Sequence, residues 1–221
     1  MTTMIKKDQI ALPECRVRHV FWKRTFDIFF SLLVLTLGFP IFLLIALSIL
    51  FTSRGSPIFS HYRIGRGGKL FRCYKFRTMF RNADVRLKKI LEENSTLRQE
   101  WEANQKLKHD PRVTQVGKFL RKTSLDELPQ FWNVLIGDLS IVGPRPVVPE
   151  ELSKHIGEKA STILSVRPGI TGLWQVSGRS NTSYRRRVRL DEKYVHNLSF
   201  MLDLTLIAKT VPVMITSRGA Y

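Results

Sequence analysis

Residues 28–51 read IFFSLLVLTLGFPIFLLIALSILF, and this stretch decides the class of fold. It holds no charged side chain, and as one helix it would be about 36 Å long, enough to cross a bilayer. A cleavable signal peptide fits poorly, because the apolar run is too long and no small-residue cleavage site follows it. A buried soluble helix also fits poorly, because apolar residues occupy every face of the helix. The sequence therefore predicts insertion into a membrane.

Two features favour a re-entrant helical hairpin over a transmembrane span. Both flanks are basic: Lys6, Lys7, Arg16, Arg18, Lys23 and Arg24 precede the stretch, and eight cations without an acid follow between Arg54 and Arg81. Lys and Arg bias a flank toward the cytoplasm, so a segment that enters and leaves on one face satisfies both flanks. Pro40 breaks the helix near its middle, two residues after Gly38. A merely kinked span is the alternative. In the hairpin, Lys23, Arg24 and Asp27 would lie at the headgroup boundary.

The overall charge predicts an anionic partner. The chain has 221 residues and a formal net charge of +18, which suits nucleic acid, anionic lipid headgroups or phosphorylated substrates. A hydrophobic content of 43% provides for a real core and argues against disorder beyond the first twenty residues. The two cysteines are too few for a disulfide framework, and the five histidines show no metal-ligand spacing.

A second informative stretch, residues 110–146, reads DPRVTQVGKFLRKTSLDELPQFWNVLIGDLSIVGPRP. Its centre is the adjacent carboxylate pair Asp126–Glu127. An aspartate that acts on phosphate, as nucleophile or metal ligand, needs cations nearby. The stretch supplies Lys118, Arg121, Lys122 and Arg145. Thr123 and Ser124 stand at N-cap spacing, which predicts both carboxylates in the first turn of a helix. For Ser124 and Glu127 alone, a capping box without a chemical role is the alternative.

The remaining pattern predicts an α-rich mixed α/β domain. Short β runs at 58–59 and 70–76 flank a Gly-rich turn at 63–68. Helices are expected over 82–107, 116–121, 125–135, 149–164 and 184–197, and a Gly-rich loop over 168–178. The apolar stretch 198–215 contains Asp203, Lys209 and Pro212, so it predicts a helix that lies in the membrane interface or packs on the domain.

Several charged side chains stand in informative settings. Lys75 and Arg77 alternate with aromatic neighbours, so a strand would place both cations on one face. Arg145 lies between two prolines, which restrict its backbone and favour a phosphate clamp; an exposed surface turn is the alternative. We expect Asp203 to pair with a neighbouring arginine, and a part in metal binding is the alternative. A basic face on the last-but-one helix, Arg185, Arg186, Arg187 and Arg189, is expected to contact solvent, anionic lipid or phosphates.

Five segments, taken in order, resemble the bacterial sugar transferases, the monotopic phosphoglycosyl transferases. They are RTFDIFFSLL (24–33), YKFRTM (74–79), the 110–146 stretch, VRPGITGLWQVSGR (166–179) and the terminal RGAY (218–221). The resemblance implies transfer of a hexose 1-phosphate, galactose or glucose, from a UDP-sugar to undecaprenyl phosphate. It places the enzyme at the cytoplasmic face of the bacterial inner membrane, in the first membrane step of exopolysaccharide, capsule or O-antigen assembly. Anionic lipids and a homodimer are the further partners that it allows.

The resemblance also implies the roles of individual residues. Asp126 would be the nucleophile that forms a covalent aspartyl-phosphosugar intermediate, with Glu127 as metal ligand or proton acceptor. The expected cofactor is Mg²⁺, or Mn²⁺, held by these two carboxylates. The expected substrate-binding residues are Lys75, Arg77, Arg121, Arg145, Arg167, Gln175 and Arg179.

We therefore expect a flexible basic N-terminus (1–20), a re-entrant membrane helix (21–53) with interfacial amphipathic helices elsewhere, and a cytoplasmic catalytic domain (54–221). A membrane-tethered nucleic-acid binder would suit the charge, but the chain has no recognisable reading motif, and we expect no nucleic-acid partner. A non-catalytic scaffold is the other class of function. Within the same chemistry, an N-acetylated or modified UDP-sugar is the alternative donor.

Overall fold

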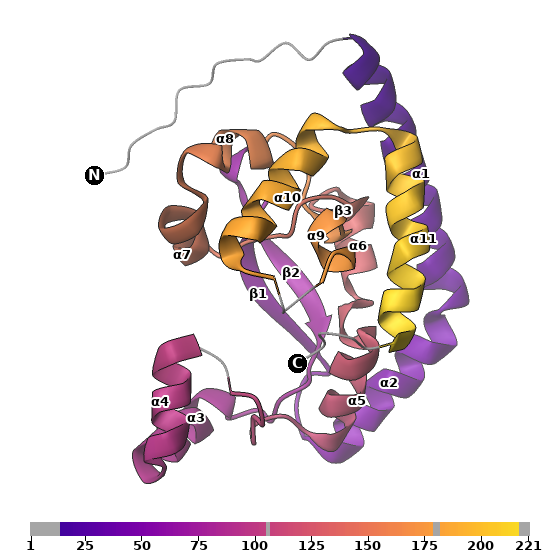
Figure 1. Cartoon of the computed structure of the whole chain (residues 1–221). Coiled ribbons are helices and arrows are strands. Elements are labelled where there is room, and N and C mark those ends of the chain that lie inside the picture. Colours follow the sequence, from indigo (N-terminus) through magenta and orange to yellow (C-terminus); the bar gives the residue numbers. More distant parts are fainter. Residues whose placement is uncertain (1–13, 105–106, 179–181, 217–221) are drawn as a thin grey trace.

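The computed structural model describes residues 14–104, 107–178 and 182–216 (Figure 1). The described part begins with α1 (Glu14–Leu37) and α2 (Phe39–Thr52), which bend by 61° at Gly38. Pro40 lies in the first turn of α2, where a missing N–H disrupts no helical hydrogen bond. Among the described helices, none is by itself long and apolar enough to cross a membrane; only this bent pair, taken together, passes that test. The predicted break at Gly38–Pro40 is confirmed, as a bend rather than a tight reversal. α1 already begins at Glu14, before the predicted start at position 21.

The outer face of the bent pair is apolar and exposed. Phe29, Leu37 and Phe51 keep 69%, 73% and 87% of their surface accessible, and many leucines between them are also exposed. The inner face packs on the domain, through Ile45 and Ile49 of α2 and through Phe26 and Phe30 of α1. A contiguous apolar surface of this size is unusual for a soluble monomer.

Two small sheets organise the rest of the chain. β1 (Ile58–Ile64) and β2 (Leu70–Phe76) form an antiparallel hairpin, as predicted. β3 (Ser140–Val142) and β4 (Gly169–Thr171) pair in parallel. The prediction of a loop over 168–178 was wrong, because β4 and α9 (Leu173–Val176) lie there. Its glycines permit close backbone approach: a Cβ on Gly169 would lie 2.1 Å from the amide nitrogen of Gly143.

The expected helix over 82–107 is two helices, α3 (Ala83–Glu93) and α4 (Ser95–Asn104), which project from the domain (Figure 1). The break falls at Asn94, whose backbone is extended and whose side chain accepts a hydrogen bond from the N–H of Leu97 at 3.0 Å. An asparagine in this role begins a new helix. Residues 105–106 lie outside the described part.

The later helices follow the predictions more closely. α5 (Gln115–Thr123), α6 (Gln130–Ile136), α10 (Tyr184–His196) and α11 (Phe200–Thr216) confirm the expected helices. The prediction of one helix over 149–164 was wrong, because Gly157 takes a positive φ of 54° and interrupts it. The stretch is a series of short helical turns that includes α7 (Pro149–Glu151) and α8 (Ala160–Ile163). α11 runs beside α1 along one flank of the molecule (Figure 1).

The main core lies where β2, α6, β3, α10 and α11 meet. Its fully buried members include Val134, Leu139, Val142, Tyr194 and Leu206. Phe26 and Phe30 of α1 pack against this cluster, so the first helix contributes to the core of the domain.

A buried polar network joins α1 to α10 and α11. Lys23 forms an ion pair with Asp203 at 2.8 Å, and Asp203 accepts a hydrogen bond from the hydroxyl of Tyr194 at 2.7 Å. The described ion-pair partner of Asp203 is therefore a lysine, where the sequence predicted an arginine. The substitute is physically reasonable, because α1 and α11 are neighbours and Lys23 faces the space between them.

Two more side chains of α1 hold backbone groups of the domain. Arg24 donates hydrogen bonds to the carbonyls of Val134 and Leu135, at 2.6 and 2.9 Å, and thereby caps the end of α6. Asp27 is 2% exposed and accepts from the N–H of Ile141 at 3.1 Å. Lys23, Arg24 and Asp27 therefore all bind protein groups, and their expected position at the headgroup boundary stays a prediction.

Candidate active site

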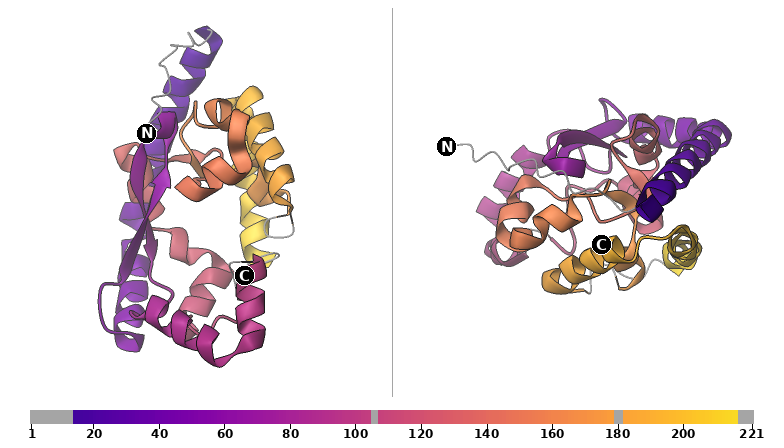
Figure 2. Two further views of the ribbon diagram at one scale, coloured as in Figure 1. Left: turned by 90° about the vertical axis from the view of Figure 1, so that its left-hand side faces the viewer. Right: turned by 90° about the horizontal axis from the view of Figure 1, so that it is seen from above.

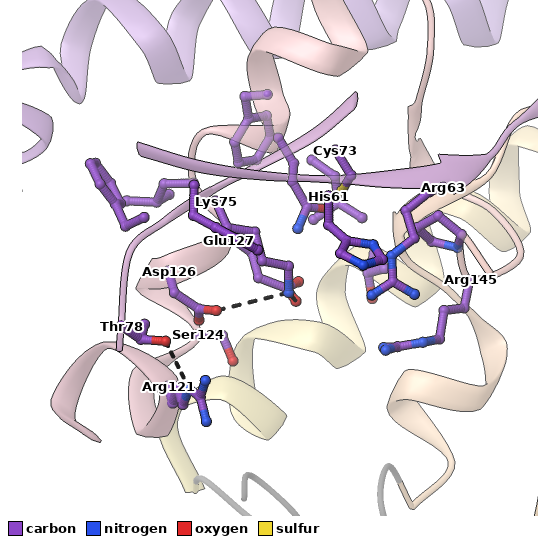
Figure 3. A pocket seen from close by; sticks show the side chains of 18 of the residues that line it. His61, Arg63, Cys73, Lys75, Thr78, Arg121, Ser124, Asp126, Glu127 and Arg145 are labelled. Atoms are coloured by element: carbon purple, nitrogen blue, oxygen red, sulfur yellow. Dashed lines mark hydrogen bonds and ion pairs between the residues drawn. The ribbon is translucent and has the colours of Figure 1, made fainter. Parts of the chain in front are cut away.

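A cavity of about 1330 Å³ lies between the β1–β2 hairpin and the helices α9 and α11, which stand on opposite sides of the molecule in Figure 2. One part of its wall is charged and includes Arg63, Lys75, Arg121, Asp126, Glu127 and Arg145 (Figure 3). Another part is apolar and comes from α1, α6 and α11, with Phe30, Val34, Phe131, Ile207, Val211 and Met214. The cavity can therefore accept a molecule with a phosphate at one end and a hydrocarbon at the other.

A short turn presents the two carboxylates. α5 ends at Thr123, Ser124 takes a left-handed backbone with φ of 59°, and Leu125–Glu127 forms one 3₁₀ turn ahead of α6. Ser124 makes no side-chain cap, so the predicted capping role was wrong; its carbonyl accepts from the N–H of Glu127 instead. Pro129 stands between this turn and α6, which separates the carboxylates from the helix predicted to contain them.

Lys75 of β2 bridges the carboxylate pair. Its Nζ lies 2.6 Å from Oε1 of Glu127 and 3.8 Å from Oδ2 of Asp126. Burial lowers the pKa of Lys75, but the charges of Glu127 and Asp126 outweigh burial and raise this pKa overall. Lys75 therefore stays protonated and holds both carboxylates against the cavity.

Asp126 is the more buried carboxylate of the pair. Its side chain is 13% exposed, and burial raises its pKa to about 6. The charges of Lys75 and Arg121 oppose this rise, and Glu127 adds to it. Asp126 is thus mainly ionised at neutral pH, yet more basic than an ordinary aspartate, which suits a nucleophile.

Arg121 lies beside Asp126, on the side away from Glu127 in Figure 3. Its Nε donates to the hydroxyl of Thr78 at 2.9 Å, which fixes the guanidinium at the cavity wall. This places Arg121 where the sequence predicted a phosphate-binding cation.

Arg145 lies toward the other end of the charged wall (Figure 3). Its guanidinium carbon is 5.4 Å from the ring centre of Trp174, and that of Arg187 is 4.8 Å from the same ring. Both distances are within the range of cation–π contacts. Trp174 is nearly buried and therefore serves as a support for two arginines rather than as an exposed stacking platform.

Three buried polar atoms of cavity residues have no hydrogen-bond partner within the described part of the chain: Arg77 Nε, Trp174 Nε1 and Gln175 Oε1. The same holds for Oδ1 of Asp191, which lies on α10 near Arg145. Burial also raises the pKa of Asp191 to about 7, against the opposing backbone hydrogen bond and charge of Arg145. Unpaired buried polar atoms are rare and commonly mark ligand or water sites. Gln175 lines the cavity, in agreement with its predicted place in the site.

Two predicted binding residues, Arg77 and Arg167, hold backbone groups of the protein. Arg77 follows β2 and donates to the carbonyls of Ser53, Arg54 and Gly55, so its guanidinium fixes the chain after α2, although it reaches the cavity wall. Arg167 does not line the cavity; its Nε donates to the carbonyl of Gly137 at the end of α6. Arg179 lies outside the described residues.

The sequence reasoning missed two cations of the cavity. Arg63 points to the same face of the hairpin as Lys75, because Arg63 pairs with Phe71 and Phe59 pairs with Lys75. Arg187 was placed only in a basic face expected to contact solvent, anionic lipid or phosphates; it lines the cavity, four residues before the buried Asp191 on α10. The helical period of that segment was the signal that could have found it.

Comparisons with known proteins identify the family of the chain. A family profile described as "Bacterial sugar transferase" matches residues 18–217. The chain belongs to the bacterial sugar transferase family. This match contains every described residue of the cavity wall and the elements that position the carboxylate pair.

Three relatives of the chain carry informative names. It is 47% identical to "Exopolysaccharide production protein ExoY" of Sinorhizobium fredii, over 90% of this chain and 88% of that protein. It is 49% identical to "Undecaprenyl-phosphate galactose phosphotransferase" of Salmonella typhimurium, over 91% of this chain and 42% of that protein. It is 38% identical to "UDP-glucose:undecaprenyl-phosphate glucose-1-phosphate transferase" of Escherichia coli, over 90% and 41%. The chain therefore spans less than half of the last two relatives, but most of the first.

Proposed function

We propose that this protein transfers hexose 1-phosphate, galactose or glucose, from a UDP-sugar to undecaprenyl phosphate, releasing UMP. The observation that carries the proposal is the cavity in which Asp126, with cations close by, shares one space with an apolar wall from α1 and α11. A soluble donor needs the charged wall, and a lipid acceptor needs both walls. The names of the galactose and glucose phosphotransferase relatives support the same reaction.

The transfer takes two displacements. An oxygen of Asp126 attacks the β-phosphorus of the donor, and the bond from this phosphorus to the bridging oxygen breaks. UMP leaves with that oxygen and the electron pair, and the sugar phosphate remains on Asp126. An oxygen of the acceptor phosphate then attacks the same phosphorus, the bond to Asp126 breaks, and the carboxylate is restored. Two steps let one site handle a water-soluble and a membrane-bound substrate in turn.

The surrounding side chains stabilise charge. Lys75 and Arg121 lie next to Asp126 and would neutralise the oxygens of the transferred phosphoryl group. Glu127, held by Lys75, would serve the incoming phosphate as a metal ligand or as a proton acceptor. The supporting cations come from β2 and α5, on either side of the catalytic turn, which keeps them fixed relative to Asp126.

The donor set fits a magnesium ion. In the described part of the chain, no group of three or more His, Cys, Asp or Glu side chains could hold a metal alone. Mg²⁺ is commonly bound by one or two carboxylates together with substrate phosphates and water, and Asp126 and Glu127 supply that number. When bound there, Mg²⁺ would neutralise the diphosphate and polarise its phosphoryl oxygens.

Membrane attachment through α1 and α2 completes the proposal. The exposed apolar face of the bent pair would enter one leaflet, and the basic residues on both flanks would keep the catalytic domain on the cytoplasmic face of the inner membrane. The donor and the carboxylates then meet in the cytoplasm, where UDP-sugars are made. Both α1 and α11 would deliver the acceptor lipid from the bilayer to the apolar wall of the cavity.

A donor panel tests the function. Purified protein in detergent or nanodiscs is incubated with undecaprenyl phosphate and UDP-galactose, UDP-glucose or their N-acetylated counterparts, and UMP is measured. We expect release with a hexose donor. Glu150→Gln, which removes an exposed acid on α7, should behave like the wild type, whereas Asp126→Asn should lose several orders of magnitude in turnover. Absence of UMP with every donor, or a tenth of normal activity in Asp126→Asn, would overturn the proposal.

A further inference from the structure

We propose that Arg63, Arg145 and Arg187 form one phosphate site that is used twice, first by the leaving UMP and then by the polyprenyl phosphate. The inference rests on the proposed function and adds to it where the non-transferred phosphate lies in each step. It also assigns Arg63 and Arg187 to substrate binding.

The three arginines form a compact group. Arg145 and Arg187 contact the ring of Trp174, at 5.4 and 4.8 Å from its centre. Burial lowers the pKa of Arg63, and the like charge of Arg145 lowers it further. The pKa of Arg187 is lowered by burial and then by Arg145 in the same way. Each guanidinium is thus close enough to Arg145 to be repelled by it, although β1, the loop after β3 and α10 supply the three residues.

Nearby acids compensate this group only in part. Glu151 lies 4.0 Å from Arg63 and its charge also acts on Arg187. Glu127 acts on Arg63 but already forms an ion pair with Lys75. Asp191 faces Arg145 and Arg187 from the same helix as Arg187. Because burial raises the pKa of Asp191 to about 7, this carboxyl carries only part of its charge at neutral pH. The arginines therefore keep an excess of positive charge at the wall of the cavity, as an anion site requires.

The three arginines and Arg121 lie on opposite sides of the carboxylate pair. The charge of Arg121 acts on Asp126, that of Lys75 on both carboxylates, and that of Arg63 on Glu127. Figure 3 shows the same order, with Lys75 and Glu127 between Asp126 and the two labelled arginines, Arg63 and Arg145. A phosphoryl group on Asp126 would therefore have Arg121 on one side and the three arginines on the other.

The chemistry explains why one site serves both phosphates. In each displacement, the oxygen that leaves or enters lies in line with the bond to Asp126, on the opposite side of phosphorus. UMP departs from this position in the first step, and the acceptor phosphate attacks from it in the second. No second phosphate pocket is needed, and the two phosphates cannot be bound together.

The test measures binding in the absence of chemistry. In Asp126→Asn protein in detergent, radiolabelled UMP is bound by equilibrium dialysis and titrated with farnesyl phosphate, a short polyprenyl phosphate. We expect complete displacement of UMP. Adding Arg187→Ala should weaken both ligands by a similar factor, on the order of tenfold, and Arg187→Lys should restore part of the affinity of each. Arg186→Ala, which removes an exposed arginine from the next position of α10, is the matched control and should change neither.

Retention of UMP at saturating farnesyl phosphate would overturn the inference, and so would weakening of only one ligand by Arg187→Ala. Thermal unfolding shows whether each variant is folded. If Arg187→Ala is not, the affinities of Arg187→Lys for the two ligands decide whether they share the site. UMP release by the wild type is measured separately. If the wild type transfers sugar phosphate but the two ligands bind together, the shared site is wrong and the function stands. If the ligands compete but no donor yields UMP, the function is wrong and the anion site stands.

Discussion

Replacing Asp126 by Asn should stabilise the protein while abolishing its activity. Burial raises the pKa of Asp126 to about 6 from an ordinary value of 3.8, so the folded protein disfavours the charge that catalysis needs. An amide has nearly the same shape but no charge, and it removes this unfavourable contribution to the free energy of folding. The site would then be an example in which function is maintained at the expense of stability.

The size of the effect follows from linkage. Each pKa unit corresponds to about 1.4 kcal/mol, so the gap between 3.8 and about 6 gives ~3 kcal/mol as an upper estimate at pH 7.5. Lys75 loses one of its two acidic neighbours in the variant, which reduces the net gain to roughly 1–3 kcal/mol. For a chain of this length, that corresponds to a rise in Tm of roughly 2–10 °C.

The stability difference between Asp126→Asn and the wild type should also depend on pH. The penalty is complete above the folded pKa of about 6, shrinks as the pH falls through it, and vanishes below the unfolded value of 3.8. Thermal unfolding of the wild type, Asp126→Asn and the control Glu150→Gln is compared in detergent at pH 7.5 and pH 4.5. A variant that is no more stable than the wild type at pH 7.5, or one with the same advantage at both pH values, would refute the reasoning.

Four further outcomes are expected. Without acceptor, the rate of the UMP burst should fall about tenfold from pH 7 to pH 5 as Asp126 protonates. Lys75→Met should move this fall in the pH–rate profile to higher pH. A flat profile contradicts the assignment of Asp126. EDTA should abolish UMP release, and Mg²⁺ or Mn²⁺ but not Ca²⁺ should restore it; full activity in EDTA would mean that cationic side chains suffice. Arg145→Ala should lower kcat/KM in steady-state assays by roughly 100-fold, whereas Arg167→Ala should lower Tm in thermal unfolding and leave kcat/KM unchanged. A kinetic loss in Arg167→Ala with a normal Arg145→Ala would contradict these roles. In a Cys15→Ser background, the cysteines of Met4→Cys and Gly67→Cys should both resist impermeant thiol reagents on intact cells. Labelling of Met4→Cys from outside would exclude the re-entrant topology.

The sequence predicted those helices and strands whose structure depends on neighbouring residues along the chain. The β1–β2 hairpin followed from alternation around Gly65–Gly68, and the break between α1 and α2 followed from Pro40. The helices α5 and α10 followed from their apolar period. Where contacts with distant parts of the chain decide, the reasoning failed: β4 exists because glycines let its backbone approach Gly143, and this closeness is invisible in a list of neighbours along the chain.

The site shows the same division. Asp126, Glu127, Lys75, Arg121, Arg145 and Gln175 line the cavity as the motifs predicted. Arg167 stands in an equally distinctive motif, yet it holds the end of α6, because a motif records that a residue matters and not whether it acts on substrate or on the fold. Arg63 and Arg187 have no such motif and required the strand register and the helix face to be known.

The attachment of α1 to the domain has a practical consequence for anyone who wants a water-soluble fragment. Cutting the chain after Thr52 would remove the apolar surface that hinders crystallisation and assay. The same cut would strip Asp203 of its lysine, leave the last carbonyls of α6 without Arg24, and open the core that Phe26 and Phe30 cover. Redesign of the outward-facing leucines of α1 and α2 to polar residues, with Lys23, Arg24 and Asp27 retained, is therefore the sounder route to a fragment that keeps its catalytic turn in place.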